Sequence, residues 1–434
     1  MPRKTLLTIG LLALLSLALP RTREWLGWRK QEPAKVEPEK AEPEAEKPED
    51  RAPTIPEKHP LLADPAGNLR TFYQALLRSE MREPGAITRV LHYGDSPTTA
   101  DSITADVREL LQRRFGDGGH GFVLVSPPWA WYGHRGIKIR SRGWKDEPAS
   151  QGHRAKDRLH GLGGVSSTGA AGASATIELP DDSHTRMEVL YLKQPGGGGL
   201  RVTAEDVPIA EISTAAEEKA SGFAEAPLPP GTRSVTVTAV GGRVRVFGVV
   251  FEKKGPGLIY HSLGLNGASV QMALRFFDRA NWTEQLQHQN PDLVVINYGS
   301  NETFFARYVE STYPKELEAL LVRVREALPK TSILVMSPMD RGERDKTGTI
   351  VTPPILPRLV EAQRKVALAN NCAFFNTFEA MGGAGTMAKW YQAKPRLVSA
   401  DFLHPLPQGA AKVGKHLEQA LLEGYDHWKA VRSR

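Results

Sequence analysis

The stretch that decides the fold is Ile87-Thr-Arg-Val-Leu-His-Tyr93, which Gly94-Asp95-Ser96-Pro97 follows without a break. A run rich in branched and aromatic side chains predicts a short β-strand that ends at the glycine. Proline is tolerated in the first turn of a helix, and residues 101–115 carry apolar side chains at helical spacing. The stretch therefore predicts a strand, a tight turn and a helix, which is the repeating unit of an α/β fold.

The same alternation returns in the second half of the chain. Further strands are predicted at residues 258–263, 293–298, 333–336 and 373–375. Helices are predicted at residues 69–81, 269–278, 314–327, 356–369 and 408–422. Strands that alternate with helices at this spacing predict a parallel sheet with helices on both faces.

Residues 135–255 interrupt this alternation. They are rich in Gly, Thr, Ser and Val, and Pro195-Gly-Gly-Gly-Gly199 and Pro229-Pro-Gly231 are turn signals. Alternating segments predict half-buried strands at residues 185–192, 234–238 and 243–247. We therefore expect an all-β sandwich at residues 135–255, inserted into an α/β domain made of residues 66–134 and 256–426.

The N-terminal sixty residues differ in composition from the rest of the chain. Residues 1–30 contain an apolar run from Leu6 to Leu19 with Arg and Lys on both sides, which is typical of a signal peptide or a membrane anchor. The run is shorter than the roughly 20 residues that span a bilayer and its cleavage site is poor, so both interpretations stay open. Residues 31–60 are rich in Pro, Glu, Lys and Ala and predict a disordered linker. These features predict an exported protein of the periplasm or cell envelope.

The positive charge of the chain is spread out. The net charge is +7, to which residues 1–30 contribute +5 and residues 31–60 contribute −4. A nucleic-acid-binding domain carries a clustered basic stripe, so no nucleic-acid partner is expected. The only cysteine, Cys372, lies in an apolar stretch, which excludes an intramolecular disulfide, leaves no cysteine cluster for zinc and predicts a buried thiol.

Three polar motifs follow predicted strands. Ser96 follows the strand at residues 87–93, Gly267 lies shortly after the strand at residues 258–263, and Asn301 comes after Tyr298. Ligands bind beyond the carboxyl ends of the strands of an open parallel sheet, so the fold would bring the three residues to one edge. Each motif alone is also compatible with an ordinary turn or a helix N-terminus.

A fourth motif, Asp401-Phe-Leu-His404, supplies a carboxylate and an imidazole. Serine is a weak nucleophile until a base takes its proton, and a carboxylate can orient the imidazole that acts as the base. We predict Ser96 as the nucleophile, His404 as the base and Asp401 as its partner, with a surface loop as the alternative for the last two. His92 competes as a base, but its place inside a strand predicts a core histidine.

A tetrahedral intermediate needs hydrogen-bond donors aimed at its oxyanion. The backbone N–H groups of Ser96 and Gly267 and the side-chain amide of Asn301 would supply three. A glycine at position 267 fits this role because the backbone can then approach the substrate without a Cβ atom.

The four motifs in this order resemble those of the SGNH (GDSL-type) hydrolase family. Ser96 stands in the nucleophile block, Gly267 in the oxyanion-glycine block, Asn301 in the asparagine block, and Asp401 and His404 in the last block. One departure is visible, because Glu302 follows Asn301 where an aspartate is usual. The resemblance implies a flavodoxin-like three-layer α/β/α fold, an acyl-serine intermediate and no metal or organic cofactor.

A finer resemblance is to exported peptidoglycan O-acetylesterases, in which a β insert resembles a carbohydrate-binding module. Three tryptophans near the start of the insert, Trp129, Trp131 and Trp144, could contact sugar rings or could seal the joint between the two domains. Nearby cations could meet acidic groups of a glycan, at Arg135, Lys138, Arg140, Arg142 and Lys145.

We therefore expect a serine esterase that removes O-acetyl groups from a cell-envelope polysaccharide, with peptidoglycan as the first choice and the membrane as a partner if the N-terminal segment is uncleaved. The same site could transfer the acetyl group to another sugar, which would make the protein an O-acetyltransferase. A non-catalytic glycan-binding protein is an alternative from another class. A lipid esterase is a further alternative, although no long apolar lid segment lies near the motifs.

Overall fold

The structure is a computed structural model that describes residues 61–150 and 154–432. The expected export segment at residues 1–30 and the expected linker at residues 31–60 lie outside the described residues. Among the residues described, no helix has both the length and the apolar character that a membrane span requires.

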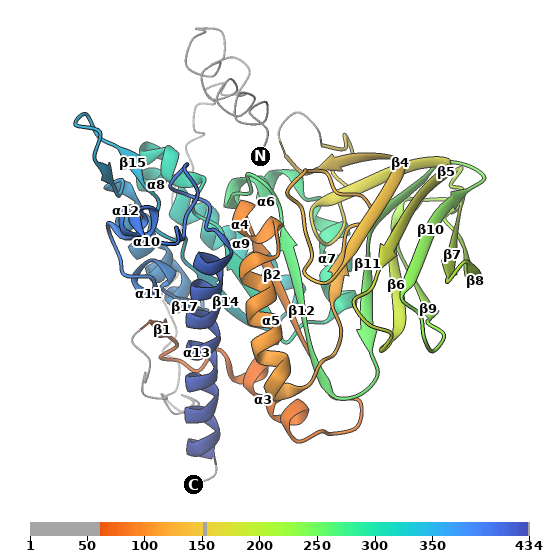
Figure 1. The fold of residues 1–434 in the computed structure, drawn as a ribbon, viewed down its shortest axis with the longest axis horizontal. Helices are drawn as coiled ribbons and strands as arrows, with labels where there is room; N and C mark the ends of the chain where they lie inside the picture. The colour runs from red at the N-terminus through yellow and green to blue at the C-terminus, as the bar shows by residue number, and fades with distance from the viewer. Residues whose placement is uncertain (1–60, 151–153, 433–434) are drawn as a thin grey trace, which may run out of the picture. The chain divides into compact units, whose positions relative to one another are not determined.

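A six-stranded sheet forms the centre of the α/β part (Figure 1). Its order is β1 (Leu62–Ala63), β17 (Ala373–Phe375), β14 (Ser332–Met336), β13 (Leu293–Asn297), β2 (Ile87–Gly94) and β12 (Gly257–Gly264). The strands from β17 to β12 run parallel, as the sequence predicts, whereas β1 pairs antiparallel with β17. The sheet is therefore mixed, because a short strand before the first predicted helix joins its edge.

Helices cover both faces of this sheet, which confirms the expected flavodoxin-like layering (Figure 1). One layer contains α3 (Arg70–Glu80), α5 (Ser102–Phe115) and α13 (Pro407–Arg432), and the other contains α6 (Val270–Phe276), α7 (Arg279–Gln289), α9 (Tyr313–Ala327) and α10 (Ile355–Ala369). Alternate side chains of β13 enter the two cores, with Leu293 and Val295 in one and Val294 and Ile296 in the other. This alternation follows from the two-residue period of a strand.

Helices α7 and α13 depart from the sequence prediction. Helix α7 was not predicted, because its sequence is mostly polar and only Trp282 and Leu286 are apolar side chains that it buries. Helix α13 continues to Arg432, ten residues beyond the predicted end at residue 422. Its last turns are held by Tyr425 and Trp428, which pack in the same core as α3.

Residues between β2 and β12 form a second, antiparallel sheet. Its path is β8 (Val207–Ser213), β7 (Gly199–Ala204), β10 (Ser234–Val240), β5 (Val165–Glu178), β11 (Val244–Lys253), β6 (His184–Lys193) and β9 (Ala220–Pro227), while β4 (Lys138–Pro148) pairs with β5 and β3 (Gly121–Val123) pairs with β11. Hydrogen bonds join all nine strands in one sheet with its own hydrophobic core. The separate layers of a sandwich stay a prediction. Strand β3 belongs to this sheet, although its residues fall in the range assigned to the α/β domain.

The antiparallel sheet packs against the α/β part beside the strand that leads to Ser96. Phe122, Leu162 and Phe247 of the antiparallel part share one core cluster with the α/β residues. Tyr93 on β2 donates a hydrogen bond to the carbonyl oxygen of Leu162 at 3.1 Å, and Trp282 donates to the Tyr93 hydroxyl at 3.0 Å. The joint is therefore both apolar and hydrogen bonded.

Candidate active site

Three adjacent strands end at the same level of the sheet. Gly94, the last residue of β2, pairs with Gly264 of β12 on one side and with Asn297 of β13 on the other. The loops that follow carry Ser96, Gly267 and Asn301. Because the carboxyl ends of parallel strands meet at one edge, the topology places all three loops together.

The turn at Ser96 depends on two close backbone approaches. The short helix α4 (Ser96–Thr99) starts two residues after β2 and packs on the ends of β2 and β12. A Cβ atom on Gly94 would lie 2.0 Å from Thr98 Oγ1, and one on Gly264 would lie 2.3 Å from Thr99 N. Glycine at both strand ends therefore lets the helix that presents Ser96 seat directly on the sheet.

Ser96, His404 and Asp401 form one hydrogen-bonded chain. The Ser96 Oγ lies 2.8 Å from His404 Nε2, and His404 Nδ1 lies 2.7 Å from Asp401 Oδ2. A carboxylate only accepts, so Nδ1 carries the proton and Nε2 accepts from the serine. The side chains of His404 and Asp401 are 41% and 51% exposed, so solvent reaches the chain from this side.

The loop that carries His404 is shaped by local contacts. Asp401 Oδ1 accepts from the backbone N–H groups of Leu403 at 3.0 Å and His404 at 3.1 Å, and also from the Ser399 hydroxyl. The N–H of Ser399 donates to the carbonyl oxygen of His404 at 2.9 Å. The spacing Asp-x-x-His therefore makes a closed turn in which one carboxylate orients both the backbone and the imidazole.

The electrostatics of this pair favour a charged imidazole. Burial opposes the charge of Asp401, but the hydrogen bonds from His404 and Ser399 hold the pKa of its carboxyl well below the usual range. Burial also lowers the pKa of His404, but the hydrogen bond and charge of Asp401 outweigh it and raise that pKa above its ordinary value. A raised pKa suits a group that takes a proton from serine.

The two other predicted oxyanion donors lie in facing loops. Asn301 Nδ2 donates to the carbonyl oxygen of Ala268 at 2.8 Å, which ties the asparagine loop to the glycine loop. Gly267 is exposed and has φ +71°, and no protein atom lies within 4 Å of a Cβ built on it. The positive φ requires glycine, and the open space beside it leaves room for a substrate.

Two buried carboxyl groups flank these donors, and the sequence analysis did not assign them a role. Glu302 is 2% exposed and accepts from Val270 N at 2.9 Å, so it caps helix α6 just after the Gly267 loop. Burial, opposed by the Val270 hydrogen bond, raises the pKa of Glu302 to about 8. Burial, opposed by a hydrogen bond from Ser300, likewise raises the pKa of Asp95 to about 6. In the sequence, the one feature that could have drawn attention to Glu302 was that it stands where an aspartate is usual.

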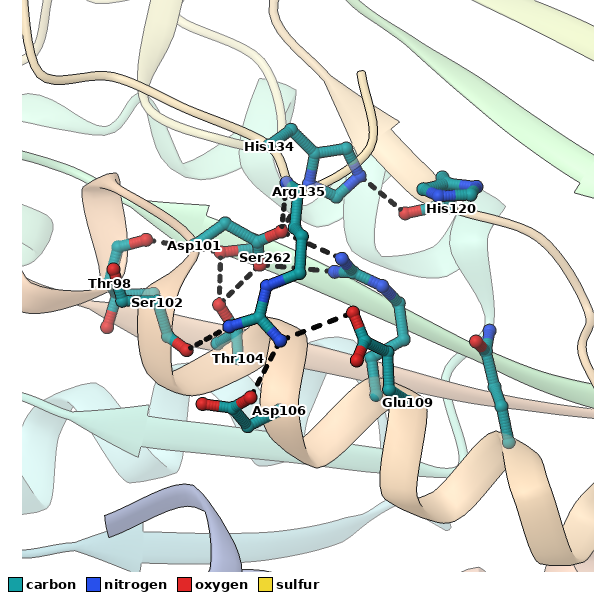
Figure 2. A network of polar contacts seen from close by, with 12 residues as sticks. Thr98, Asp101, Ser102, Thr104, Asp106, Glu109, His120, His134, Arg135 and Ser262 are labelled. Carbon is teal, nitrogen blue, oxygen red and sulfur yellow. Dashed lines mark hydrogen bonds and ion pairs between the residues drawn. The ribbon is translucent and has the colours of Figure 1, made fainter. Parts of the chain in front are cut away.

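A buried polar network surrounds Asp101, which lies between α4 and α5 (Figure 2). The Asp101 side chain is fully buried and accepts from several groups: Thr104 Oγ1 at 2.6 Å, Arg108 Nη2 at 2.8 Å, Arg135 N at 2.9 Å and His134 Nδ1 at 2.9 Å. Gly133 N also donates to Thr99 O at 3.2 Å. The network therefore fixes the loop that precedes β4 against the helix that presents Ser96.

The three predicted tryptophans have different environments. Trp129 is half-buried against the core that the two parts share, and Trp144 is half-buried against the core of the antiparallel sheet. Trp131 is 44% exposed. Only Trp131 of the three therefore offers a large free face. Trp129 packs at the joint between the two parts, as the alternative interpretation expects, whereas Trp144 packs within the antiparallel sheet.

Two other residues that the sequence analysis considered, His92 and Cys372, are buried in the core. His92 is fully buried, its Nδ1 lies 2.8 Å from the Tyr260 hydroxyl, and burial lowers its pKa to about 4. Cys372 is a buried free thiol whose pKa burial raises to about 11. Within the described ranges, no group of three or more His, Cys, Asp or Glu side chains has the arrangement of a metal site.

Comparison with known proteins identifies the family pattern in part of the chain. Residues 232–412 match the model of the GDSL-like lipase/acylhydrolase family. This range contains Gly267, Asn301, Asp401 and His404, whereas Ser96 precedes it. A comparison with curated protein sequences gives no match.

A solved structure with a high TM-score shows the same fold. A peptidoglycan O-acetylesterase superposes with a TM-score of 0.72 at 22% identity, over 84% of this chain and 99% of that chain. A salicylyl-acyltransferase from a tetracycline biosynthetic pathway matches with a TM-score of 0.31 at 15% identity, over 70% of this chain and 98% of that one. A family two carbohydrate esterase from Clostridium thermocellum matches with a TM-score of 0.27 at 12% identity, over 60% of this chain and 95% of that one. The family match and the fold shared with the first structure support a carboxylic ester hydrolase with the SGNH fold.

Proposed function

We propose that this carboxylic ester hydrolase is a serine esterase that removes O-acetyl groups from a cell-envelope polysaccharide, with peptidoglycan as its main substrate. The observation that carries the proposal is the hydrogen-bonded chain from Ser96 through His404 to Asp401 at the carboxyl edge of the sheet. The fold shared with a peptidoglycan O-acetylesterase supports the choice of substrate.

The first half of the proposed reaction forms an acetyl-enzyme. Ser96 Oγ attacks the acetyl carbonyl carbon while His404 Nε2 takes the hydroxyl proton, and Asp401 stabilises the imidazolium that results. The N–H groups of Ser96 and Gly267 and the amide of Asn301 donate to the oxyanion. When the tetrahedral intermediate collapses, the sugar oxygen leaves and takes the proton from His404. The acetyl group is then an ester of Ser96.

The second half returns the free enzyme. A water molecule gives a proton to His404 Nε2 and attacks the acetyl carbonyl carbon, and the same donors hold the oxyanion. Collapse breaks the bond to Ser96 Oγ, which regains the proton from His404, and acetic acid leaves. Because His404 and Asp401 are about half exposed, water reaches the acetyl-enzyme easily, which favours hydrolysis over transfer to a second sugar.

Release of acetate tests the proposal. The full chain and the Ser96→Ala variant are incubated with O-acetylated peptidoglycan and with acetylated neutral polysaccharides, and free acetate is measured. We expect release from peptidoglycan and a loss of at least a thousandfold in the variant, since the nucleophile is gone. Full activity of a folded Ser96→Ala protein would refute the assignment. Acetylation of an added glycan without acetate release would identify a transferase.

The exported location and membrane attachment predicted from residues 1–30 belong to this proposal as well. An esterase for a cell-wall polymer must act outside the cytoplasm, and the apolar run from Leu6 to Leu19 with flanking Arg and Lys is typical of an export segment. Cell fractionation with and without residues 1–30 tests this point. Activity confined to the cytoplasm would contradict it.

A further inference from the structure

The basic residues that the sequence placed near the antiparallel sheet are mostly neutralised by carboxylates. Arg135 pairs with Asp106 at 2.6 Å, and Lys145 pairs with Glu147 at 2.8 Å. Lys138 and Arg140 both pair with Glu178, while Arg142 donates to the Ser174 hydroxyl. Strand β4 and the segment just before it are therefore weak candidates for binding an anion.

A different set of cations stands without such partners. We name it the basic rim, and it consists of Arg344, Lys346, Lys389, Lys394 and Arg396. All five are exposed, and no described carboxylate lies within ion-pair distance of any of them. Of the acidic side chains nearby, Glu343 pairs with Arg341, whereas Asp345 accepts only from N–H and hydroxyl groups of its own turn and keeps its negative charge. Five cations against this one carboxylate leave the rim with an excess of positive charge.

Contacts tie the basic rim to the loop that carries His404. Gly342, just before the hairpin of β15 (Glu343–Arg344) and β16 (Ile350–Val351), donates its N–H to the carbonyl oxygen of Phe402 at 2.8 Å. The Arg344 guanidinium lies 5.1 Å from the centre of the Phe402 ring. Phe402 is the residue directly after Asp401, so this cation borders the proposed catalytic loop.

The second half of the rim approaches the same ring. Tyr391, on α12 (Thr386–Gln392), meets Phe402 edge to face at 4.8 Å, and the Arg396 guanidinium lies 4.3 Å over Tyr391. Asp340 holds the two halves together, because it accepts from Thr352 after the hairpin at 2.8 Å and from the N–H of Met387 on α12 at 2.9 Å. Arg344 and Arg396 therefore lie on one connected wall beside the loop that carries His404.

Exposed aromatic faces continue this wall toward the Asn301 loop. Phe304 and Phe305 are 57% and 65% exposed, and they follow Asn301 by three and four residues. Arg341 donates to Thr303 Oγ1 at 2.7 Å and lies 4.3 Å over the Phe304 ring, so it joins the hairpin to that loop. Exposed ring faces suit sugar rings, and unpaired cations suit anionic groups.

We propose that the basic rim binds the anionic groups of an acidic polysaccharide and makes the enzyme selective for acetylated glycans that carry carboxylate or phosphate groups. The inference rests on the proposed esterase activity. Clustered cations beside a site raise the local concentration of an anionic substrate, and salt weakens this effect. Carboxylate is the first choice, because the proposed substrate, peptidoglycan, carries carboxylates on its peptides.

Charge reversal in the rim tests the proposal in the full chain. The kcat/KM values of the Arg344→Glu/Arg396→Glu variant are compared for O-acetylated peptidoglycan, an O-acetylated phosphate-containing glycan, an acetylated neutral xylan and p-nitrophenyl acetate. We expect the ratio of acidic glycan to neutral substrate to fall at least tenfold, mainly through KM. The Arg344→Lys/Arg396→Lys variant should keep the ratio. A charge-matched control, Lys138→Glu/Arg142→Glu, should also keep it.

A binding measurement separates failure of the rim from failure of the esterase proposal. The Ser96→Ala protein is titrated with soluble acidic and neutral glycan fragments at 50 and 500 mM NaCl, with a DNA oligonucleotide as a third ligand. The proposal for the rim is supported if the acidic fragment binds more tightly than the neutral one and if both high salt and Arg344→Glu/Arg396→Glu abolish this preference. This outcome supports the rim even if the natural protein deacetylates no glycan. Equal binding of acidic and neutral fragments would overturn the inference, as would tighter binding of DNA than of the acidic fragment. In the kinetic experiment, an equal loss of kcat/KM on all substrates in the charge-reversed variant would also overturn it.

Discussion

Asp401 shows how much one carboxylate determines at the residue scale. Its Oδ1 accepts from Leu403 N and His404 N, and its Oδ2 lies 2.7 Å from His404 Nδ1. One side chain therefore closes the turn, sets the tautomer of the imidazole and supplies the negative charge that a cationic His404 needs. These tasks can be separated by a change that keeps the shape and removes the charge.

Asp401→Asn is expected to reduce kcat/KM by roughly 10²- to 10⁴-fold and to shift the pH profile. His404 must be neutral to take the serine proton, so activity rises with pH through the pKa of His404. Burial lowers that pKa, but Asp401 raises it above its ordinary value, so loss of the charge should move the acidic limb to lower pH. The measurement is p-nitrophenyl acetate hydrolysis between pH 4 and 9. An acidic limb that stays in place would contradict the role of Asp401.

Glu302 is expected to make stability depend on pH. Burial raises the pKa of Glu302 to about 8, whereas an unfolded glutamate titrates near 4.5, so the folded chain holds a proton that the unfolded chain releases between these values. Stability from this group therefore falls as pH rises through that window. In thermal unfolding, Glu302→Gln should gain Tm relative to the natural protein from pH 5 to pH 8. The exposed Glu310→Gln control should show no such trend.

At the scale of elements, Asp101 joins the Ser96 turn, helix α5 and the segment before β4 (Figure 2). Its backbone has φ +52°, and its side chain is fully buried. Burial opposes its charge, but Arg108 and His134 hold its pKa well below the usual value. A buried ion pair of this kind contributes little net energy when intact, and breaking it leaves an uncompensated charge.

Two arginines of this network give a matched comparison. Arg108→Ala removes a guanidinium that is 2% exposed and leaves Asp101 buried without its main partner, so a loss of about 3–5 kcal/mol in the free energy of unfolding is expected. Arg135→Ala removes a guanidinium that is 40% exposed and pairs with Asp106 and Glu109, so a loss of at most about 1 kcal/mol is expected. Urea unfolding checks both values. Equal losses would show that burial does not decide the cost.

At the scale of the whole described part of the chain, the two sheets share a core. Phe122, Leu162 and Phe247 from the antiparallel part lie in one apolar cluster with Leu263 and Trp282 of the α/β part. An ion pair adds to the joint, between Arg89 on β2 and Glu252 on β11 at 2.8 Å. Neither sheet can therefore lose its partner without exposing apolar surface to water.

The shared core predicts one cooperative unfolding transition for the two sheets. Calorimetry of the full chain should give a single peak whose van't Hoff and calorimetric enthalpies agree. Phe247→Ala should reduce the free energy of unfolding by about 3–5 kcal/mol and so lower the midpoint temperature of this peak, because the ring is 1% exposed in the joint. The control Val207→Ala, 61% exposed on β8, should change stability by less than about 0.5 kcal/mol. Two separate peaks would refute the shared unit.

Local patterns in the sequence were enough to predict most of the α/β part. The strand from Ile87 to Gly94 and the helix ending at Phe115 have nearly their expected bounds, because period and turn residues are local properties. The placement of the loops that carry Ser96, Gly267 and Asn301 at one edge of the sheet also followed, because parallel strands end at one edge. Helix α7 escaped prediction because a polar sequence with few apolar positions shows almost no period.

The chain by itself therefore determined the alternation of strands and helices and the residue types available for the site, since both depend on neighbours along the sequence. Only the tertiary structure decided which charges are neutralised. The sequence offered Arg140 as a cation that could meet acidic groups of a glycan, but Glu178 pairs with it in the structure. Arg396 gave no signal in the sequence, and Tyr391 and Phe402 place it beside the His404 loop. The same holds for Glu302, whose raised pKa depends on burial against α6. Charge, burial and pairing are properties of three-dimensional surroundings, and residues far apart in the sequence create them.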